Sequence, residues 1–308
     1  MKKLLGIVLI FTLAISCKNE KKEKAEESTK STFQEIKKED YELYKPTKKI
    51  NAVLVLFGGY PEVSEDIKRE FKILEIAKKN NVAVIFSNYN KKLWLEKNEK
   101  YQLAKRLQEI IESNKLPTDN IFVGGFSSGG VVSLLLSDYI VGMKQFFIDP
   151  KGVFIVDSPI DLAALYFTSE KNIKRNFSTV SVQESNWLIE TLGNTFGNPK
   201  DEIINYENNS VFTFKSNNTS NLNKLKNTKI RLYTEPDTIW WKKNRMADYD
   251  QMNAFYIKKL SESLKEKEFR NVEYIPTKNK GYRANGERHP HSWAIVDKED
   301  LINWILEK

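Results

Sequence analysis

Short apolar runs recur along the chain from residue 50 onward, and the segments between them carry apolar residues at helical spacing. The runs cover residues 50–57, 82–86, 121–126, 152–157, 229–234 and 272–275. Nearly continuous runs rich in Val, Ile and Phe are typical of strands buried on both faces. Strands that alternate with helices build β-α-β units, so the pattern predicts an α/β domain with a mostly parallel sheet covered by helices on both faces.

Helical spacing is clearest in five segments. One begins after Pro61 and has Ile67, Phe71 and Leu74 as its apolar stripe; the others are residues 97–114, 184–196, 246–267 and 297–307. Weak alternation over residues 33–44 predicts one or two edge strands before the main sheet. The rhythm breaks between residues 158 and 227, which are rich in Asn, Ser and Lys, and this break predicts an insertion.

The third apolar run ends in a serine flanked by glycines. Gly125-Phe126-Ser127-Ser128-Gly129 fits the G-x-S-x-G nucleophile elbow, a sharp turn between a strand and a helix. Ser127 is the candidate nucleophile, because a register centred on Ser128 would put the bulky Phe126 where a small residue is needed. Phosphate binding is not expected, since the loop lacks both a closing Lys-Ser/Thr pair and the G-x-G-x-x-G spacing.

A serine hydroxyl needs a base, and the chain has only two histidines, His289 and His291, between the last strand and the last helix. A metal site is the alternative interpretation of a close histidine pair. With no cysteine nearby and Glu287 as the local carboxylate, we expect no metal and no cofactor.

The serine turn, the position of the histidines and the order of strands and helices resemble the α/β-hydrolase family over roughly residues 45–308. His291 with Trp293 is similar to a His-x-Trp pattern of esterases and peptidases in that family, which favours His291 over His289 as the base. The resemblance implies an acid in the loop after strand 229–234, with Asp237 preferred and Glu235 as the alternative. The chain order Ser127, Asp237, His291 is the one expected of the family.

The same resemblance implies an oxyanion hole and a cap. The hole would use the backbone N–H of Ser128 and that of Gly59 or Tyr60. The insertion at about residues 158–227 is similar to the lid or cap of these enzymes, although a surface excursion without substrate contact fits the sequence equally well. Trp240 and Trp241 either line a pocket or belong to the core.

The first residues have the pattern of an export signal. Lys2 and Lys3 precede an apolar stretch too short to span a membrane, and Leu13-Ala14-Ile15-Ser16-Cys17 resembles a bacterial lipobox. Residues 1–17 are therefore interpreted as a lipoprotein signal peptide with lipidation at Cys17, and charged residues 18–40 as a disordered tether. This predicts an exported lipoprotein anchored to the cell envelope, at the outer membrane.

Charge adds one exclusion. The formal net charge is +8, but lysines and glutamates are interleaved along the whole chain, so we expect a solvated surface and no nucleic-acid partner. The expected partners are a small-molecule or short-peptide substrate and a membrane reached through Cys17. The sequence predicts a serine hydrolase acting on a carboxylic ester; the alternatives are a serine aminopeptidase or dipeptidyl peptidase, and a non-catalytic binding lipoprotein on the same scaffold.

Overall fold

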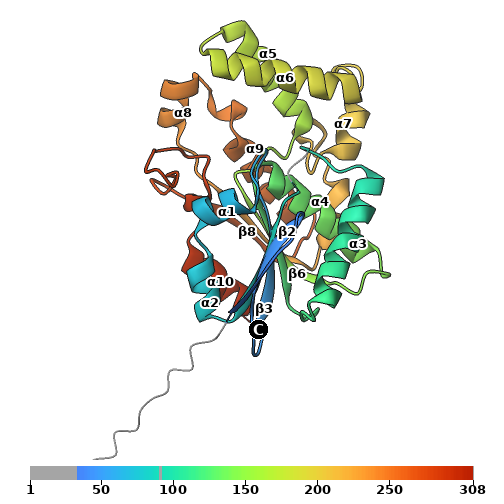
Figure 1. The fold of residues 1–308 in the computed structure, drawn as a ribbon. Coiled ribbons are helices and arrows are strands. Elements are labelled where there is room, and N and C mark those ends of the chain that lie inside the picture. Colours follow the sequence, from blue (N-terminus) through green and yellow to red (C-terminus); the bar gives the residue numbers. More distant parts are fainter. Residues whose placement is uncertain (1–32, 90–91, 308) are drawn as a thin grey trace, which may run out of the picture. The chain divides into compact units, whose positions relative to one another are not determined.

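The computed structural model describes residues 33–89 and 92–307, which build one sheet with helices packed around it (Figure 1). The strands are β1 (Phe33–Lys37), β2 (Tyr41–Pro46), β3 (Ala52–Phe57), β4 (Val82–Ser87), β5 (Ile121–Phe126), β6 (Pro150–Val156), β7 (Lys229–Thr234) and β8 (Val272–Pro276). Their order in the sheet is β1-β2-β4-β3-β5-β6-β7-β8. The first two pairings are antiparallel and all later ones are parallel, so the sheet is mostly parallel, as predicted.

Helices follow the strands along the chain. They are α1 (Ser64–Phe71), α2 (Leu74–Lys79), α3 (Lys97–Ser113), α4 (Ser128–Gly142), α5 (Leu162–Arg175), α6 (Thr179–Phe196), α7 (Ile203–Asn209), α8 (Thr238–Arg245), α9 (Asn253–Glu266) and α10 (Lys298–Leu306). The single helix expected after Pro61 is two, because Lys72 takes a left-handed conformation (φ 52°) that ends α1. The helix expected over 246–267 begins later, at Asn253, because Met246 closes α8 in the same way (φ 50°).

Both faces of the sheet are buried. Because side chains alternate along a strand, Val53 and Val55 of β3 join one core with α3, α4 and α9, while Leu54 and Leu56 join the other with α1, α2 and α10. Figure 1 shows α1, α2 and α10 on one side of the sheet and α3 and α4 on the other. The uninterrupted apolar run of β3 is therefore required by two cores.

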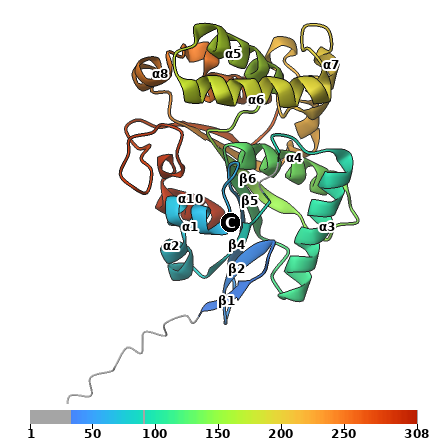
Figure 2. The same ribbon diagram turned by 45° about the horizontal axis from the view of Figure 1, so that its top comes forward.

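The region between β6 and β7 forms its own small structure. Helices α5 and α6 pack side by side above the sheet (Figure 2). Their shared cluster includes Tyr166, Leu192 and Phe196, together with Leu93 and Trp94 from the segment after β4. The insertion is thus held by an apolar contact of its own, in addition to its two chain connections.

The predicted signal peptide, Cys17 and the tether up to residue 32 lie outside the described residues. Phe33–Lys37 pairs with β2, with Phe33 opposite Pro46. This confirms the strands expected over residues 33–44 and shows that the disordered tether predicted over 18–40 is wrong for Phe33–Lys37. None of the helices in the described ranges is both long and apolar enough to cross a membrane.

Candidate active site

Ser127 lies at the carboxyl end of β5, in the turn that starts α4. Its backbone has φ 51° and ψ −127°, a conformation that residues with a side chain rarely adopt. The Ser127 N–H donates to the carbonyl of Val156 at 2.9 Å, which fixes the turn against β6. The hydroxyl therefore stands at the edge of the sheet where the parallel strands end.

Two glycines of the motif are required by the closeness of backbones. A Cβ on Gly125 would lie 2.2 Å from the carbonyl carbon of Gly129, and one on Gly129 would lie 2.2 Å from the carbonyl oxygen of Phe57. Neither side has room for a methyl group, so β3, β5 and α4 can meet at this turn only with glycine at both positions.

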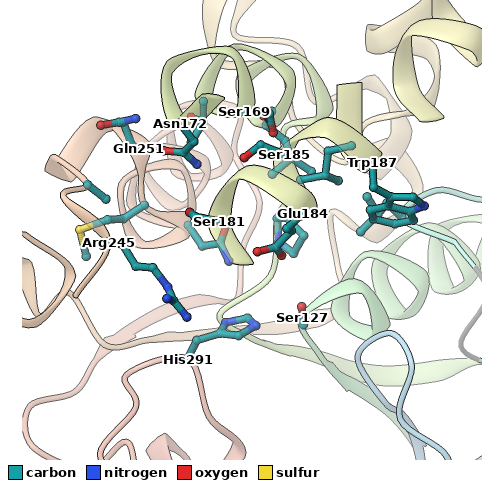
Figure 3. Close-up of a pocket in the computed structure, with 18 of the residues that line it drawn as sticks. Ser127, Ser169, Asn172, Ser181, Glu184, Ser185, Trp187, Arg245, Gln251 and His291 are labelled. Atoms are coloured by element: carbon teal, nitrogen blue, oxygen red, sulfur yellow. Dashed lines mark hydrogen bonds between the residues drawn. The ribbon is translucent and has the colours of Figure 1, made fainter. Parts of the chain in front are cut away.

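His291 faces Ser127 from the loop between β8 and α10. In Figure 3 the imidazole points toward the Ser127 hydroxyl, and both residues line the same pocket. The Nδ1 atom of His291 lies 2.7 Å from Oδ2 of Asp157, which directly follows β6. Asp157 is 4% exposed, and its Oδ1 accepts a hydrogen bond from the Thr234 hydroxyl at 2.6 Å. The structure thus brings a serine hydroxyl and an imidazole to one pocket, with a buried carboxylate on the Nδ1 side of the imidazole.

The predicted pairing of Asp237 with His291 is wrong. Asp237 caps α8 by accepting from the Trp240 N–H, and its Oδ2 binds Arg288 at 2.6 Å. The alternative, Glu235, is also occupied: its carboxylate pairs with Arg288 and accepts the N–H groups of Lys280 and Gly281. Both carboxylates therefore hold the loop that carries His291, and neither contacts its ring.

In the sequence, Asp157 is the last residue of the run 152–157, which is predicted to be a buried strand. The available signal was its position at the carboxyl end of the strand that follows the nucleophile strand. Ser127, Asp157 and His291 keep the chain order of the expected triad, with a carboxylate one strand earlier than predicted.

The predicted oxyanion donors differ in how they are used. The Gly59 N–H donates to Oε2 of Glu62 at 3.0 Å, and the Tyr60 N–H donates to the Ser128 hydroxyl at 2.9 Å. Ser128 contributes the first N–H of α4, one of the helix amides that have no acceptor within the helix. Both loop amides therefore already have an acceptor in the structure, which does not choose between Gly59 and Tyr60 as the partner of Ser128.

Glu62 holds the loop that carries Gly59 and Tyr60. Its Oε2 also accepts from the indole N–H of Trp293, whose ring stacks on Phe71 with centroids 4.5 Å apart. Burial raises the pKa of the Glu62 carboxyl, and the hydrogen bonds from Trp293 and Gly59 act against that rise. The His-x-Trp pattern thus has a structural meaning here: His291 faces the pocket and Trp293 anchors its loop in the core.

His289 is buried beside the two tryptophans. Its ring centroid lies 4.6 Å from that of Trp240 and 6.0 Å from that of Trp241. Burial, with the charge of Arg283 next in effect, lowers the pKa of His289 to about 3. Trp241 lines the pocket, which is one of the two roles considered for the pair, whereas Trp240 is half-buried and packs against His289. Among residues 33–89 and 92–307, no group of three His, Cys, Asp or Glu side chains is arranged to hold a metal ion.

The pocket above Ser127 has a volume of about 240 Å³ and is roofed by the insertion. Leu165 of α5 lines it, and Figure 3 shows Asn172 of α5 with Glu184 and Trp187 of α6 around it. Trp187 stacks on Tyr60 with ring centroids 5.6 Å apart and planes 9° from parallel. The insertion therefore supplies part of the wall of the same pocket that contains Ser127 and His291.

No protein-family model matches the sequence, and no curated protein matches it significantly. Solved structures do resemble it. The Francisella virulence factor BioJ is 16% identical with a TM-score of 0.51, over 90% of this chain and 85% of that one. A hormone-sensitive lipase from a metagenome library is 12% identical with a TM-score of 0.50, over 90% and 86%.

An acylaminoacyl peptidase in complex with a peptide chloromethyl ketone is 16% identical with a TM-score of 0.51, over 90% of this chain and 41% of that one. Together with the topology, these likenesses show that the chain has the α/β-hydrolase fold, as predicted. The structural neighbours thus include a lipase and a peptidase, and a mutant of the esterase E40 is a further one, 12% identical with a TM-score of 0.50 over 91% of this chain and 86% of that one.

Proposed function

We propose that this chain is a serine hydrolase that cleaves a carboxylic ester through an acyl-enzyme. The observation that carries the proposal is the 2.7 Å contact between His291 Nδ1 and the buried Asp157 carboxylate, on the far side of an imidazole that faces a strained serine. A buried carboxylate on Nδ1 fixes the tautomer in which Nε2 can accept a proton from the serine hydroxyl. A histidine without a catalytic role does not require a buried carboxylate on Nδ1.

The steps follow from the geometry. The Ser127 Oγ attacks the substrate carbonyl while His291 takes its proton, and the ion pair with Asp157 stabilises the imidazolium. The negative charge that develops on the carbonyl oxygen lies at the start of α4, where the Ser128 N–H and the helix dipole stabilise it. His291 then gives its proton to the departing alkoxide, and the same imidazole activates the water that releases the acyl group.

A peptidase is the second candidate, and one residue favours it. Glu184 of α6 lines the pocket over Ser127 (Figure 3), where its carboxylate could receive a substrate amine. Glu184→Gln distinguishes the two functions. It should lower the kcat/KM for a free-amine dipeptide amide and leave that for an uncharged aryl ester unchanged.

Hydrolysis of short-chain aryl esters by the full chain tests the main proposal. Ser127→Ala should lower kcat by about 10³-fold or more. Ser216→Ala, an exposed serine outside the pocket, should keep the parent rate. Equal rates for the parent and Ser127→Ala would show that Ser127 is not the nucleophile.

We also propose that the enzyme is an exported lipoprotein, on the strength of the lipobox-like sequence before Cys17. Incorporation of labelled palmitate into the parent chain and not into Cys17→Ala would support it. Equal incorporation in both would refute lipidation at Cys17.

A further inference from the structure

Arg245 is a charged side chain of the pocket with no role in the triad. It lies in the last turn of α8, is half-buried, and has no hydrogen-bond or ion-pair partner within the part of the chain that the structure describes. Figure 3 shows its side chain entering the pocket with the guanidinium on the His291 side. Its charge also acts on the neighbouring His289, whose pKa it helps to lower. An arginine at this place has its planar fork of donors directed at whatever the pocket holds.

The wall around Arg245 is rich in donors. Arg175 of α5 donates through Nη2 to Oε1 of Gln251 at 2.8 Å, and Gln251 lines the pocket. Nη1 of Arg175 and Nε2 of Gln251 are buried and have no acceptor among the described residues. Of these two residues Gln251 lines the pocket, so its amide is the group of this pair placed to meet a ligand acceptor.

The acidic residues near this wall are engaged elsewhere. Asp248 binds Lys242 at 2.6 Å, and Asp250 binds Lys171 at 3.3 Å. Glu184, the carboxylate-bearing side chain of the pocket lining, lies on α6, whereas Arg245 lies on α8. The His291 side of the pocket is therefore positive.

The position of His291 tells which part of a substrate meets this wall. The imidazole delivers its proton to the leaving group, so the leaving group lies on the His291 side. The other side is apolar, with the stacked rings of Tyr60 and Trp187 and the side chains of Leu93 and Leu188, and suits the acyl group. We propose that Arg245 binds an anionic group, a carboxylate or a phosphate, on the leaving group of the substrate. This inference rests on the proposed function and names its substrate class.

A matched pair of esters measures this preference directly. The acetate esters meta-acetoxybenzoate and meta-acetoxybenzamide have the same acyl group and nearly the same shape, but only the first leaving group is charged. The full chain should cleave the benzoate with a kcat/KM about tenfold or more above that of the benzamide, because a charge-assisted bidentate pair is worth that much in a partly buried site. Arg245→Met should bring the ratio close to one, and Arg245→Lys should give an intermediate ratio because it keeps the charge without the fork.

Lys243→Met is the control, because it removes the same charge from an exposed position on the same helix. It should leave the ratio at the parent value. Equal ratios in the parent and Arg245→Met, or an equal fall in Lys243→Met, would overturn the proposal. A third ester, meta-acetoxyphenyl phosphate, distinguishes recognition of a phosphate from that of a carboxylate. The anion preferred by Arg245 is the one whose ester shows the larger fall in kcat/KM in Arg245→Met.

Labelling with a fluorophosphonate separates this proposal from the proposed function. All variants should still form an adduct on Ser127. In the parent chain, meta-hydroxybenzoate should slow this labelling and meta-hydroxybenzamide should not, which measures the same preference without turnover. Protection by both to the same extent would contradict the role of Arg245. Absence of both labelling and cleavage in the parent chain would refute the serine hydrolase itself.

Discussion

Replacing Asp157 by Asn should nearly abolish activity, whereas replacing Asp237 by Asn should not. Asp157 is 4% exposed, and its Oδ2 lies 2.7 Å from Nδ1 of the imidazole. At an effective dielectric constant of about 20, a charge pair about 4 Å apart is worth about 4 kcal/mol. Asn removes this stabilisation of the imidazolium, and its amide can also impose the wrong tautomer on His291. We therefore expect kcat to fall by about 10³- to 10⁴-fold.

Asp237→Asn is the matched control because it changes the residue that sequence alone favoured. Asn caps helices about as well as Asp does, and Glu235 still holds Arg288 when the Asp237 charge is gone. We expect kcat within about threefold of the parent, with the free energy of unfolding lower by about 1 kcal/mol or less.

Steady-state hydrolysis of an uncharged aryl ester, with urea unfolding of each variant, measures both effects. An active Asp157→Asn beside an inactive, folded Asp237→Asn would refute the assignment of the acid.

Three further predictions concern the elements that hold the site. Gly129→Ala places a Cβ 2.2 Å from the Phe57 carbonyl oxygen and should lower the free energy of unfolding by about 1–3 kcal/mol or more. Gly142→Ala, on the same helix, meets only the Lys224 side chain and should leave the free energy of unfolding unchanged. Equal urea midpoints for the two variants would contradict this. Arg288→Gln leaves the buried Glu235 charge without its cation, so it should cost about 3 kcal/mol and lower kcat by loosening the loop of His291; an unchanged unfolding curve would show that the ion pair is unimportant. His289 has a pKa of about 3 in the folded protein, against an ordinary value of 6.5. Between these pH values the unfolded chain binds a proton at His289 and the folded chain does not, so the free energy of unfolding falls as the pH drops from 6.5 toward 3. His289→Phe should therefore gain at most about 2 kcal/mol of stability at pH 5 relative to pH 8, and identical pH slopes for the two proteins would rule this out.

The strands and the turn that carries Ser127 were predictable because their signals are local. A strand buried on both faces must be apolar at successive positions, as β3 is, and a turn with backbones 2.2 Å from a hypothetical Cβ must use glycine, as the elbow does. Ser127 could be identified from five residues for the same reason. His291 followed from the small number of histidines and from the resemblance of His291 and Trp293 to the His-x-Trp pattern.

The acid was not predictable in this way, because its identity depends on a contact between residues 134 positions apart. Asp157, Glu235 and Asp237 all follow parallel strands that end at the same edge of the sheet. The choice among them is made by Arg288, which binds the last two and so leaves the first to His291. Nothing in the local sequence of any of these carboxylates records that arginine.

Helix boundaries were missed where single residues change the backbone. Lys72 and Met246 adopt left-handed conformations that end α1 and α8, although neither is a residue type that marks a helix end. Arg245 is the last residue of α8, so its position in the pocket depends on the helix ending at Met246, which hydrophobic periodicity does not predict.

Activation of Ser127 by His291 can be measured by covalent labelling of the serine. The full chain is treated with a fluorophosphonate, and the adduct is mapped by mass spectrometry beside Ser127→Ala and His291→Ala. We expect one adduct, on Ser127, and none in Ser127→Ala. In His291→Ala the adduct should form at least about 10³-fold more slowly. Labelling of another residue, or labelling of Ser127 at the parent rate without His291, would contradict this prediction.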